Sequence, residues 1–204
     1  MIRERSYRFS DSSLYSLLSD NGRGQVHVDR FAHEFSVPLT DTHGTDHNLM
    51  DNPFMARAIQ LSLDNVLSGQ GGPFGAVIVQ HGSIVAEGVN RVTATNDPTA
   101  HAEVVAIRQA CAKLGGFELK DCELYSSCEP CPMCLGAIYW SRLSRVYYGG
   151  VAADAAAAGF NDSFIYREIE KPLTGRAIPM MQMMREQALA SFRAWQQKSN
   201  KIPY

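Results

Sequence analysis

The chain has 204 residues, of which 45% are hydrophobic and 20% charged, a composition typical of a globular protein. The 19 basic and 21 acidic residues give a formal net charge of -2, without the basic excess of most nucleic-acid-binding proteins, so a nucleic-acid partner is not expected. No apolar stretch is long enough to span a bilayer and residues 1–6 lack the apolar core of a signal peptide, so no membrane association and a cytoplasmic location are expected.

Residues 1–49 differ in composition from the rest of the chain. They are rich in Ser, Asp, His and Arg and show no sustained periodicity. The histidines of this segment repeat no ligand spacing, so we expect surface side chains and no second metal site. These histidines are His27, His33, His43 and His47. Because Met50 opens what reads as a complete domain, the sequence predicts an N-terminal extension of unknown role over 1–49 and one domain over 50–204.

The domain is predicted to begin with a helix and a hairpin. Pro53 lies where the first turn of a helix is expected, and the helix should run to about Ser68 before the glycine-rich run 69–73. That run lacks the Lys-Ser/Thr of a phosphate-binding loop and precedes a strand, so we expect a turn close to a small ligand. Two β-branched runs, 74–80 and 84–89, predict an antiparallel hairpin.

Helices and strands are then predicted to alternate. After a polar loop over 90–98, we expect a helix capped near Thr99 and ended at Gly115-Gly116, a strand over 122–127, a helix over 131–140 and a strand over 145–148. A helical turn over 154–158, a helix to about 170, a loop over 172–179 and a fifth strand over 178–184 should follow. The last helix is expected over 185–198, with Leu189, Phe192 and Trp195 facing inward. This order predicts an α/β fold, a three-layer α/β/α sandwich with a mixed five-stranded sheet.

A metal-binding pattern lies within these elements. His101-Ala102-Glu103 is followed by Pro130-Cys131-Pro132-Met133-Cys134, a pattern typical of zinc-dependent nucleobase deaminases. One imidazole and two thiolates can bind Zn²⁺ and leave the fourth tetrahedral position to water. His101 and Cys131 fall at predicted helix N-termini, where unpaired N–H groups lower the pKa of a thiol. Cys131 and Cys134 are one helical turn apart and share a face.

Glu103 is the predicted catalytic residue. It would take a proton from the zinc-bound water, protonate a ring nitrogen of the substrate and deliver a proton to the leaving ammonia. The alternative is a closed structural zinc site with Cys128 as fourth ligand, which the position of Cys128 before the Pro130 turn disfavours. Cys111 and Cys122 are expected to be buried core thiols. An odd number of cysteines favours metal binding over a disulfide framework.

Several stretches from Met50 to the C-terminus resemble the cytidine-deaminase-like superfamily, and within it the bacterial guanine deaminases. They cover residues 71–79, 96–103, 127–140, 158–166 and 192–204. The zinc motif is common to the superfamily, and the last two stretches favour guanine deaminase. The resemblance implies a hydrolase of purine catabolism that converts guanine and water to xanthine and ammonia, with one Zn²⁺ per subunit in a homodimer.

The resemblance also implies roles in substrate binding. Phe74 would stack on the purine, Asn90 would hydrogen-bond its ring edge, the N–H of Ala102 would meet its carbonyl oxygen, Trp140 would wall the pocket, Asp162 would pair with its N–H donors, and Tyr204 would help to close the site. The family usually has an acidic residue where this chain has Asn161.

Each assignment has a plainer alternative. Phe74 could be a core side chain, Asn90 could hold a turn, Asp162 could cap a helix, and Tyr204 could lie in a frayed terminus. The methionines of the C-terminal segment are expected to pack in the core or a dimer interface; they are Met180, Met181, Met183 and Met184. Other readings of the whole chain are a tRNA adenosine deaminase, a guanosine or cytosine deaminase, and a structural zinc domain that binds proteins.

Overall fold

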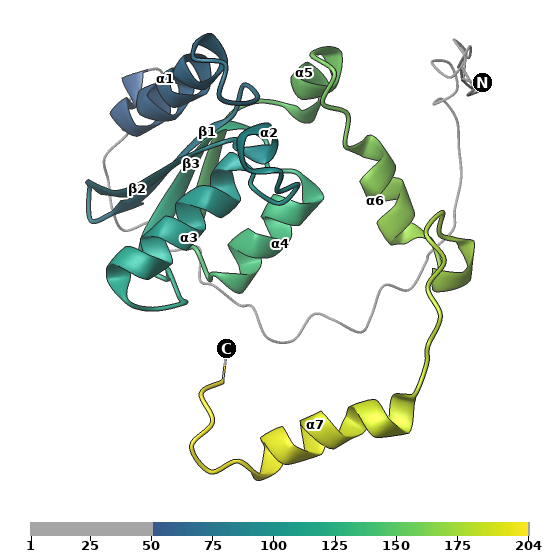
Figure 1. Ribbon diagram of the computed structural model, residues 1–204. Coiled ribbons are helices and arrows are strands. Elements are labelled where there is room, and N and C mark those ends of the chain that lie inside the picture. Colours follow the sequence, from purple (N-terminus) through teal and green to yellow (C-terminus); the bar gives the residue numbers. More distant parts are fainter. Residues whose placement is uncertain (1–50, 204) are drawn as a thin grey trace, which may run out of the picture. The chain divides into compact units, whose positions relative to one another are not determined.

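A computed structural model describes residues 51–203 of the chain (Figure 1). The predicted extension over 1–49 and the predicted lid residue Tyr204 lie outside the described residues, so both stay predictions. Among residues 51–203, no helix is both long and apolar enough to cross a membrane.

The described residues form a four-stranded mixed sheet, which confirms an α/β fold. The strands are β1 (Gly75–Gln80), β2 (Ser83–Val89), β3 (Cys122–Cys128) and β4 (Arg145–Gly150), in the order β2-β1-β3-β4. β1 is antiparallel to both β2 and β3, whereas β3 and β4 are parallel. The parallel pair is connected by a helix, so the loops after both strands lie at the same edge of the sheet.

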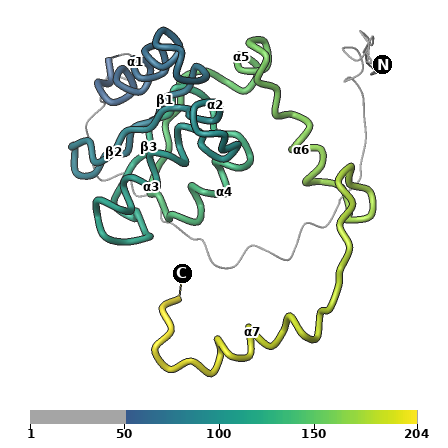
Figure 2. The backbone as a smooth tube through the Cα atoms, in the orientation of Figure 1, coloured from purple at the N-terminus to yellow at the C-terminus, as the bar shows by residue number. Residues whose placement is uncertain are grey.

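Helices cover both faces of the sheet (Figures 1 and 2). α1 (Pro53–Leu67) packs on one face, and α3 (Ala102–Leu114) and α4 (Pro132–Trp140) lie on the other. Successive side chains of a strand point to opposite faces, so Val77 and Val79 join the core under α1 while Ala76 and Ile78 join the core under α3. Because both faces are covered, β1 is buried almost throughout.

Two glycines let these helices approach the sheet closely. A Cβ at Gly75 would lie 2.3 Å from the backbone oxygen of Ala58 in α1. A Cβ at Gly88 would lie 2.2 Å from the backbone oxygen of Ala102, the first residue of α3. Because Gly88 has no side chain, the start of α3 can lie directly against β2.

The predicted fifth strand over 178–184 is wrong. Among the described residues the sheet has four strands, and this segment is exposed and outside it. An apolar run becomes a strand only where a partner strand accepts its hydrogen bonds, and Pro179 cannot donate one. The segment lies between a 3-10 helix (Leu173–Gly175) and α7 (Arg185–Gln197).

Three further expectations need correction. The polar loop over 90–98 contains a one-turn helix, α2 (Val92–Thr95), which Asn96 ends in a left-handed conformation. The N-cap of α3 is His101, while Thr99 is held by the Asp97 carboxylate. The expected inward face of α7 is not buried: Phe192 and Trp195 are 63% and 40% exposed, Leu189 is half-buried, and no residue of this helix is fully buried.

Candidate metal and substrate site

Three potential metal ligands meet where α3 and α4 begin. His101 and Cys131 are the N-cap residues of these helices, and Cys134 lies in the first turn of α4. Each sulfur lies 3.5 Å from Nδ1 of His101, and the three ligand atoms are all within 4.8 Å of one another. A tetrahedral zinc ion with bonds of about 2.0–2.3 Å would hold nitrogen and sulfur ligands about 3.5 Å apart. The ligand set thus fits zinc.

The pKa values of the two thiols are shifted in opposite directions. The hydrogen bond with the Cys134 thiol, together with that to His101, lowers the pKa of Cys131 to about 4. The same hydrogen bond and burial raise the pKa of Cys134. The Cys131 thiolate in turn raises the pKa of His101. Cys131 is thus the more readily ionised of the two thiols, and a thiolate is the species that binds a metal.

Glu103 lies beside these ligands and is only 6% exposed. Its Oε1 accepts a hydrogen bond of 3.3 Å from the Ser126 hydroxyl, and its Oε2 accepts one of 3.3 Å from the Cys134 thiol. Burial raises the pKa of its carboxyl. A carboxyl group that is costly to ionise, next to a metal site, is suited to accept and return a proton.

A pocket of about 290 Å³ opens over Glu103. That volume lies at the small end for small-molecule sites. Phe74 packs against the core and also lines the pocket, where its ring meets Phe160 edge-to-face at 5.0 Å. Phe74 thus has both of its anticipated environments. The lining residues are Phe74, Asn90, His101, Glu103, Cys128, Glu129, Cys131, Ala152, Ala155, Gly159, Phe160, Asn161, Asp162, Phe164 and Ile165.

Asn90 lies in the pocket wall and also holds a turn. Its Oδ1 accepts hydrogen bonds from the N–H groups of Gly72 (3.4 Å) and Val92 (3.3 Å). Since the side-chain oxygen is used in this way, its amide nitrogen is the atom that can donate to a ligand. Buried Asn65 of α1 completes the arrangement by donating to the backbone oxygens of Gly72 and Asn90, at 2.8 and 2.9 Å.

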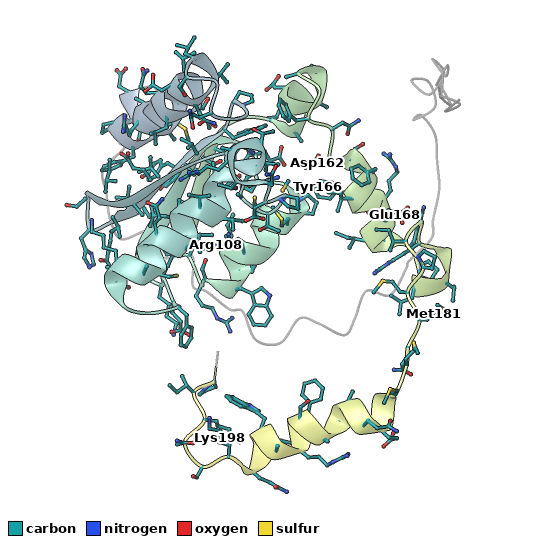
Figure 3. The ribbon with its side chains drawn as sticks, in the orientation of Figure 1. Arg108, Asp162, Tyr166, Glu168, Met181 and Lys198 are labelled. Atoms are coloured by element: carbon teal, nitrogen blue, oxygen red, sulfur yellow. The ribbon has the colours of Figure 1, made fainter. Side chains whose placement is uncertain are left out.

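Asp162 occupies the N-cap position of α6 (Ser163–Glu170) without capping it. Its side chain makes no cap hydrogen bond, and the Oδ1 of Asn161 instead accepts from the N–H of Ser163 at 2.9 Å. Figure 3 shows Asp162 and Tyr166 on the side of α6 turned towards α4. Burial and the negative charge of Asp162 raise the pKa of the Tyr166 phenol. The carboxylate of Asp162 is therefore directed to the pocket, not to its own helix.

Other predicted residues are not brought into this pocket. Trp140, at the end of α4, is 67% exposed and lines a different hollow together with Phe192 and Trp195. Ala102 begins α3 and is buried, but its side chain is not among those lining the pocket. Cys128 lines the pocket but is not part of the three-ligand cluster, and its thiol points to the backbone oxygen of Val151 at 3.8 Å. The geometry thus gives no fourth protein ligand among the described residues.

The sequence prediction missed several residues of the site, namely Asn65 and Ser126, which support lining residues by hydrogen bonds, and Glu129 and Phe160, which line the pocket. The first three act through hydrogen bonds to residues distant in sequence, which no local pattern reveals. Asn65 gives one signal, because a buried amide interrupts an otherwise apolar helix face just before a glycine run.

Comparison with known proteins extends these observations. Residues 49–150 match the cytidine and deoxycytidylate deaminase zinc-binding region. The chain is 58% identical over 151 residues to the guanine deaminase of Bacillus subtilis (strain 168), a match that covers 74% of this chain and 97% of that protein. The X-ray structure of a guanine deaminase from Bacillus subtilis superposes with a TM-score of 0.73 at 58% identity, covering 74% of this chain and 96% of that one.

More distant relatives match less of the chain. A guanine deaminase structure from Nitrosomonas europaea is 30% identical with a TM-score of 0.52, covering 69% of this chain and 81% of that one. The tRNA-specific adenosine deaminase of Agrobacterium fabrum (strain C58 / ATCC 33970) is 48% identical over 77 residues, 38% of this chain and 51% of that protein. Similarity to the tRNA enzyme therefore spans about half its length.

Proposed function

Because this chain belongs to the family defined by the cytidine and deoxycytidylate deaminase zinc-binding region, we propose that it is a zinc-dependent guanine deaminase that hydrolyses guanine to xanthine and ammonia. One observation carries the choice of substrate. A single small pocket combines residues of the metal-ligand cluster and Glu103 with three aromatic rings and the carboxylate of Asp162. The 58% identity to a guanine deaminase over 97% of its length supports the same choice.

In this proposal His101, Cys131 and Cys134 hold the zinc ion, which supplies Lewis-acid activation of water at neutral pH. Glu103 is the catalytic residue. Its carboxylate takes a proton from the attacking water and delivers it to a ring nitrogen of guanine. It then takes the second proton from the new hydroxyl group on the same carbon and delivers it to the amino group, which leaves as ammonia. The Ser126 hydroxyl donates to Oε1 of Glu103, so the carboxylate keeps its orientation through these transfers.

The pocket wall suits a neutral purine base. The ring of Phe74 offers a face for stacking, and the amide nitrogen of Asn90 can donate to the ring edge. Asp162 can accept from the N–H donors of guanine, and the N–H of Ala102, which has no partner within α3, is proposed to meet the carbonyl oxygen. The lining contains no Lys or Arg to balance a phosphate, which disfavours nucleotides and tRNA.

We also propose a homodimer in the cytoplasm. The C-terminal segment exposes a run of large apolar side chains, with Met181 and Met183 at 83% and 77%, which a stable monomer would leave in water. Trp140 and Tyr204 remain the proposed wall and lid of the complete site. All five cysteines are unpaired, as expected in a reducing compartment.

The test is ammonia release by the zinc-loaded protein, with guanine, guanosine, adenine, cytosine and tRNA offered in parallel. Turnover of guanine alone is expected. Release from tRNA or guanosine but not guanine would retain the hydrolytic chemistry and contradict the assignments of Phe74 and Asp162. No release from any substrate by a protein with stoichiometric zinc would favour a structural zinc domain.

A further inference from the structure

A carboxylate links the loop of the two cysteine ligands to the segment that carries Asp162. Glu129 follows β3, two residues before Cys131. Its Oε2 accepts a hydrogen bond of 3.0 Å from the backbone N–H of Ala152, which begins α5 (Ala152–Ala157). The two residues are 23 apart in sequence, so this bond joins separate parts of the fold.

Two further contacts occur at the same junction. The backbone N–H of Glu129 donates to the oxygen of Gly150 at 2.8 Å, which extends the parallel pairing of Cys128 with Gly150. The Cys128 thiol points to the oxygen of Val151. Residues 150–152, where the chain passes from β4 into α5, are thereby attached to residues 128 and 129.

The segment that begins at this junction forms one side of the pocket. It contributes Ala152, Ala155 and Asp162, and Glu129 itself lines the same pocket. The chain that leaves α5 is held to this helix because the N–H of Phe160 donates to the oxygen of Ala155 at 2.9 Å. Neither α5 nor α6 has a buried residue, so their position depends on contacts such as that of Glu129 and the edge-to-face pair of Phe160 with Phe74.

We propose that Glu129 is a positioning residue for base recognition. By holding the N–H of Ala152, its carboxylate fixes α5 and therefore the distance between Asp162 and the metal-ligand loop. The inference rests on the proposed function, since it takes Asp162 as the carboxylate that pairs with guanine. Glu129 carries no proton in the reaction and acts only through where it holds the segment.

Steady-state kinetics on guanine test this role with two variants at one position. Glu129→Ala removes the acceptor, and the KM for guanine should rise about tenfold or more while kcat stays within about threefold. Glu129→Gln keeps an acceptor oxygen of similar reach and should stay within about threefold of the wild-type KM. Both variants should retain one zinc per chain.

Asp154→Ala provides a matched control in the same helix. The Asp154 carboxylate accepts from the N–H of Val151 at 2.9 Å, a bond of the same type that spans three residues and joins α5 only to its own N-cap. Its loss should leave the KM within about twofold. If Asp154→Ala raises the KM for guanine as much as Glu129→Ala does, any loosening of α5 is enough to raise the KM. The specific role proposed for Glu129 would then be wrong.

Two readouts separate positioning from other roles. In an Asp162→Asn background, Glu129→Ala should add little to KM, because the group being positioned is already altered. Amide hydrogen exchange over residues 150–162 should accelerate in Glu129→Ala and not in Glu129→Gln. Full additivity of the two substitutions, or a Glu129→Gln variant as impaired as Glu129→Ala, would indicate that the Glu129 charge meets the base itself and would overturn the proposal.

Failure of the proposed function would be distinguishable. If the wild-type protein releases no ammonia from guanine, the activity assignment is wrong, and hydrogen exchange still tests whether Glu129 fixes the segment. If guanine is turned over and Glu129→Ala alters neither KM nor exchange, the inference about Glu129 alone is wrong.

Discussion

Glu103 differs from an exposed carboxylate in its pKa and in its fixed orientation. Burial raises its pKa, while the hydrogen bond from the Ser126 hydroxyl holds its orientation. Glu103→Gln keeps the size and the hydrogen-bonding oxygen but cannot transfer a proton. We expect zinc binding to persist and kcat to fall by about 10²–10⁴-fold. Zinc content by atomic emission and ammonia release by the same preparation check this, and a variant without zinc would show that Glu103 stabilises the ligand cluster instead.

Asn65 is the residue on which the pocket's glycine loop depends. Its amide nitrogen satisfies the carbonyls of Gly72 and Asn90, and no other side chain of the described residues bonds these two oxygens in the structure. Asn65→Ala should cost about 2 kcal/mol in the free energy of unfolding, since the buried carbonyl of Asn90 loses its side-chain donor and that of Gly72 keeps only the N–H of Phe74. The KM for guanine should rise as well, because Asn90 lines the pocket.

Urea unfolding measures this loss, and Ser68→Ala is a suitable control. Ser68 ends the same helix and donates to the backbone oxygen of Asn65, but it is exposed. Its removal should change stability by no more than about 0.5 kcal/mol. Equal losses in the two variants would mean that the amide of Asn65 has no special role.

At the scale of elements, the seating of α3 on β2 sets the metal site. A Cβ at Gly88 would come within 2.2 Å of the oxygen of Ala102 and 2.6 Å of the nitrogen of Ala106. Gly88→Ala should therefore push the start of α3 away from the sheet, at a cost of about 1–3 kcal/mol or more. Because His101 and Glu103 flank Ala102, zinc affinity should fall too, which a competitive zinc chelator titration would measure.

Gly136→Ala is the matched glycine variant for this experiment. Gly136 lies within α4, and a Cβ there would meet nothing within 4 Å. The substitution should be neutral or stabilise the protein by up to about 1 kcal/mol, because alanine favours the helix. If Gly88→Ala behaves like Gly136→Ala, the start of α3 can shift without consequence and the seating argument is wrong.

Sequence patterns predicted the elements whose signals are local. The Asn52-Pro53 start of α1, the hairpin of β1 and β2, and the Gly115 end of α3 all follow from caps, turns and periodicity within a few residues. The zinc cluster was predictable for the same reason, since two short motifs specify it. The strand predicted over 178–184 is wrong because an apolar run indicates only that the side chains favour burial. It does not indicate which part of the protein, or which other chain, they pack against.

At the scale of the molecule, the apolar side chains of the C-terminal segment are not buried by other described residues of the chain. Met181 and Met183 are the most exposed of its methionines, and β4 pairs with β3 alone among the strands of the described residues. α7 likewise has no buried residue although its sequence carries Phe192 and Trp195. In a two-fold dimer, the same surface of each chain contacts the other chain, so a second copy could bury these exposed side chains.

Light scattering on the purified protein should therefore give about twice the chain mass of 22.5 kDa at micromolar concentration. Replacing Met181 and Met183 together by Glu should shift the protein to the monomer, because two charges would have to be buried in an apolar contact. Gln182→Glu adds charge between these positions, on a side chain that is already polar, and should leave the dimer intact. A wild-type monomer, or a dimer unaffected by the double substitution, would mean that the exposed methionines serve another purpose. Loss of guanine turnover with the dimer would further indicate that the partner completes the site.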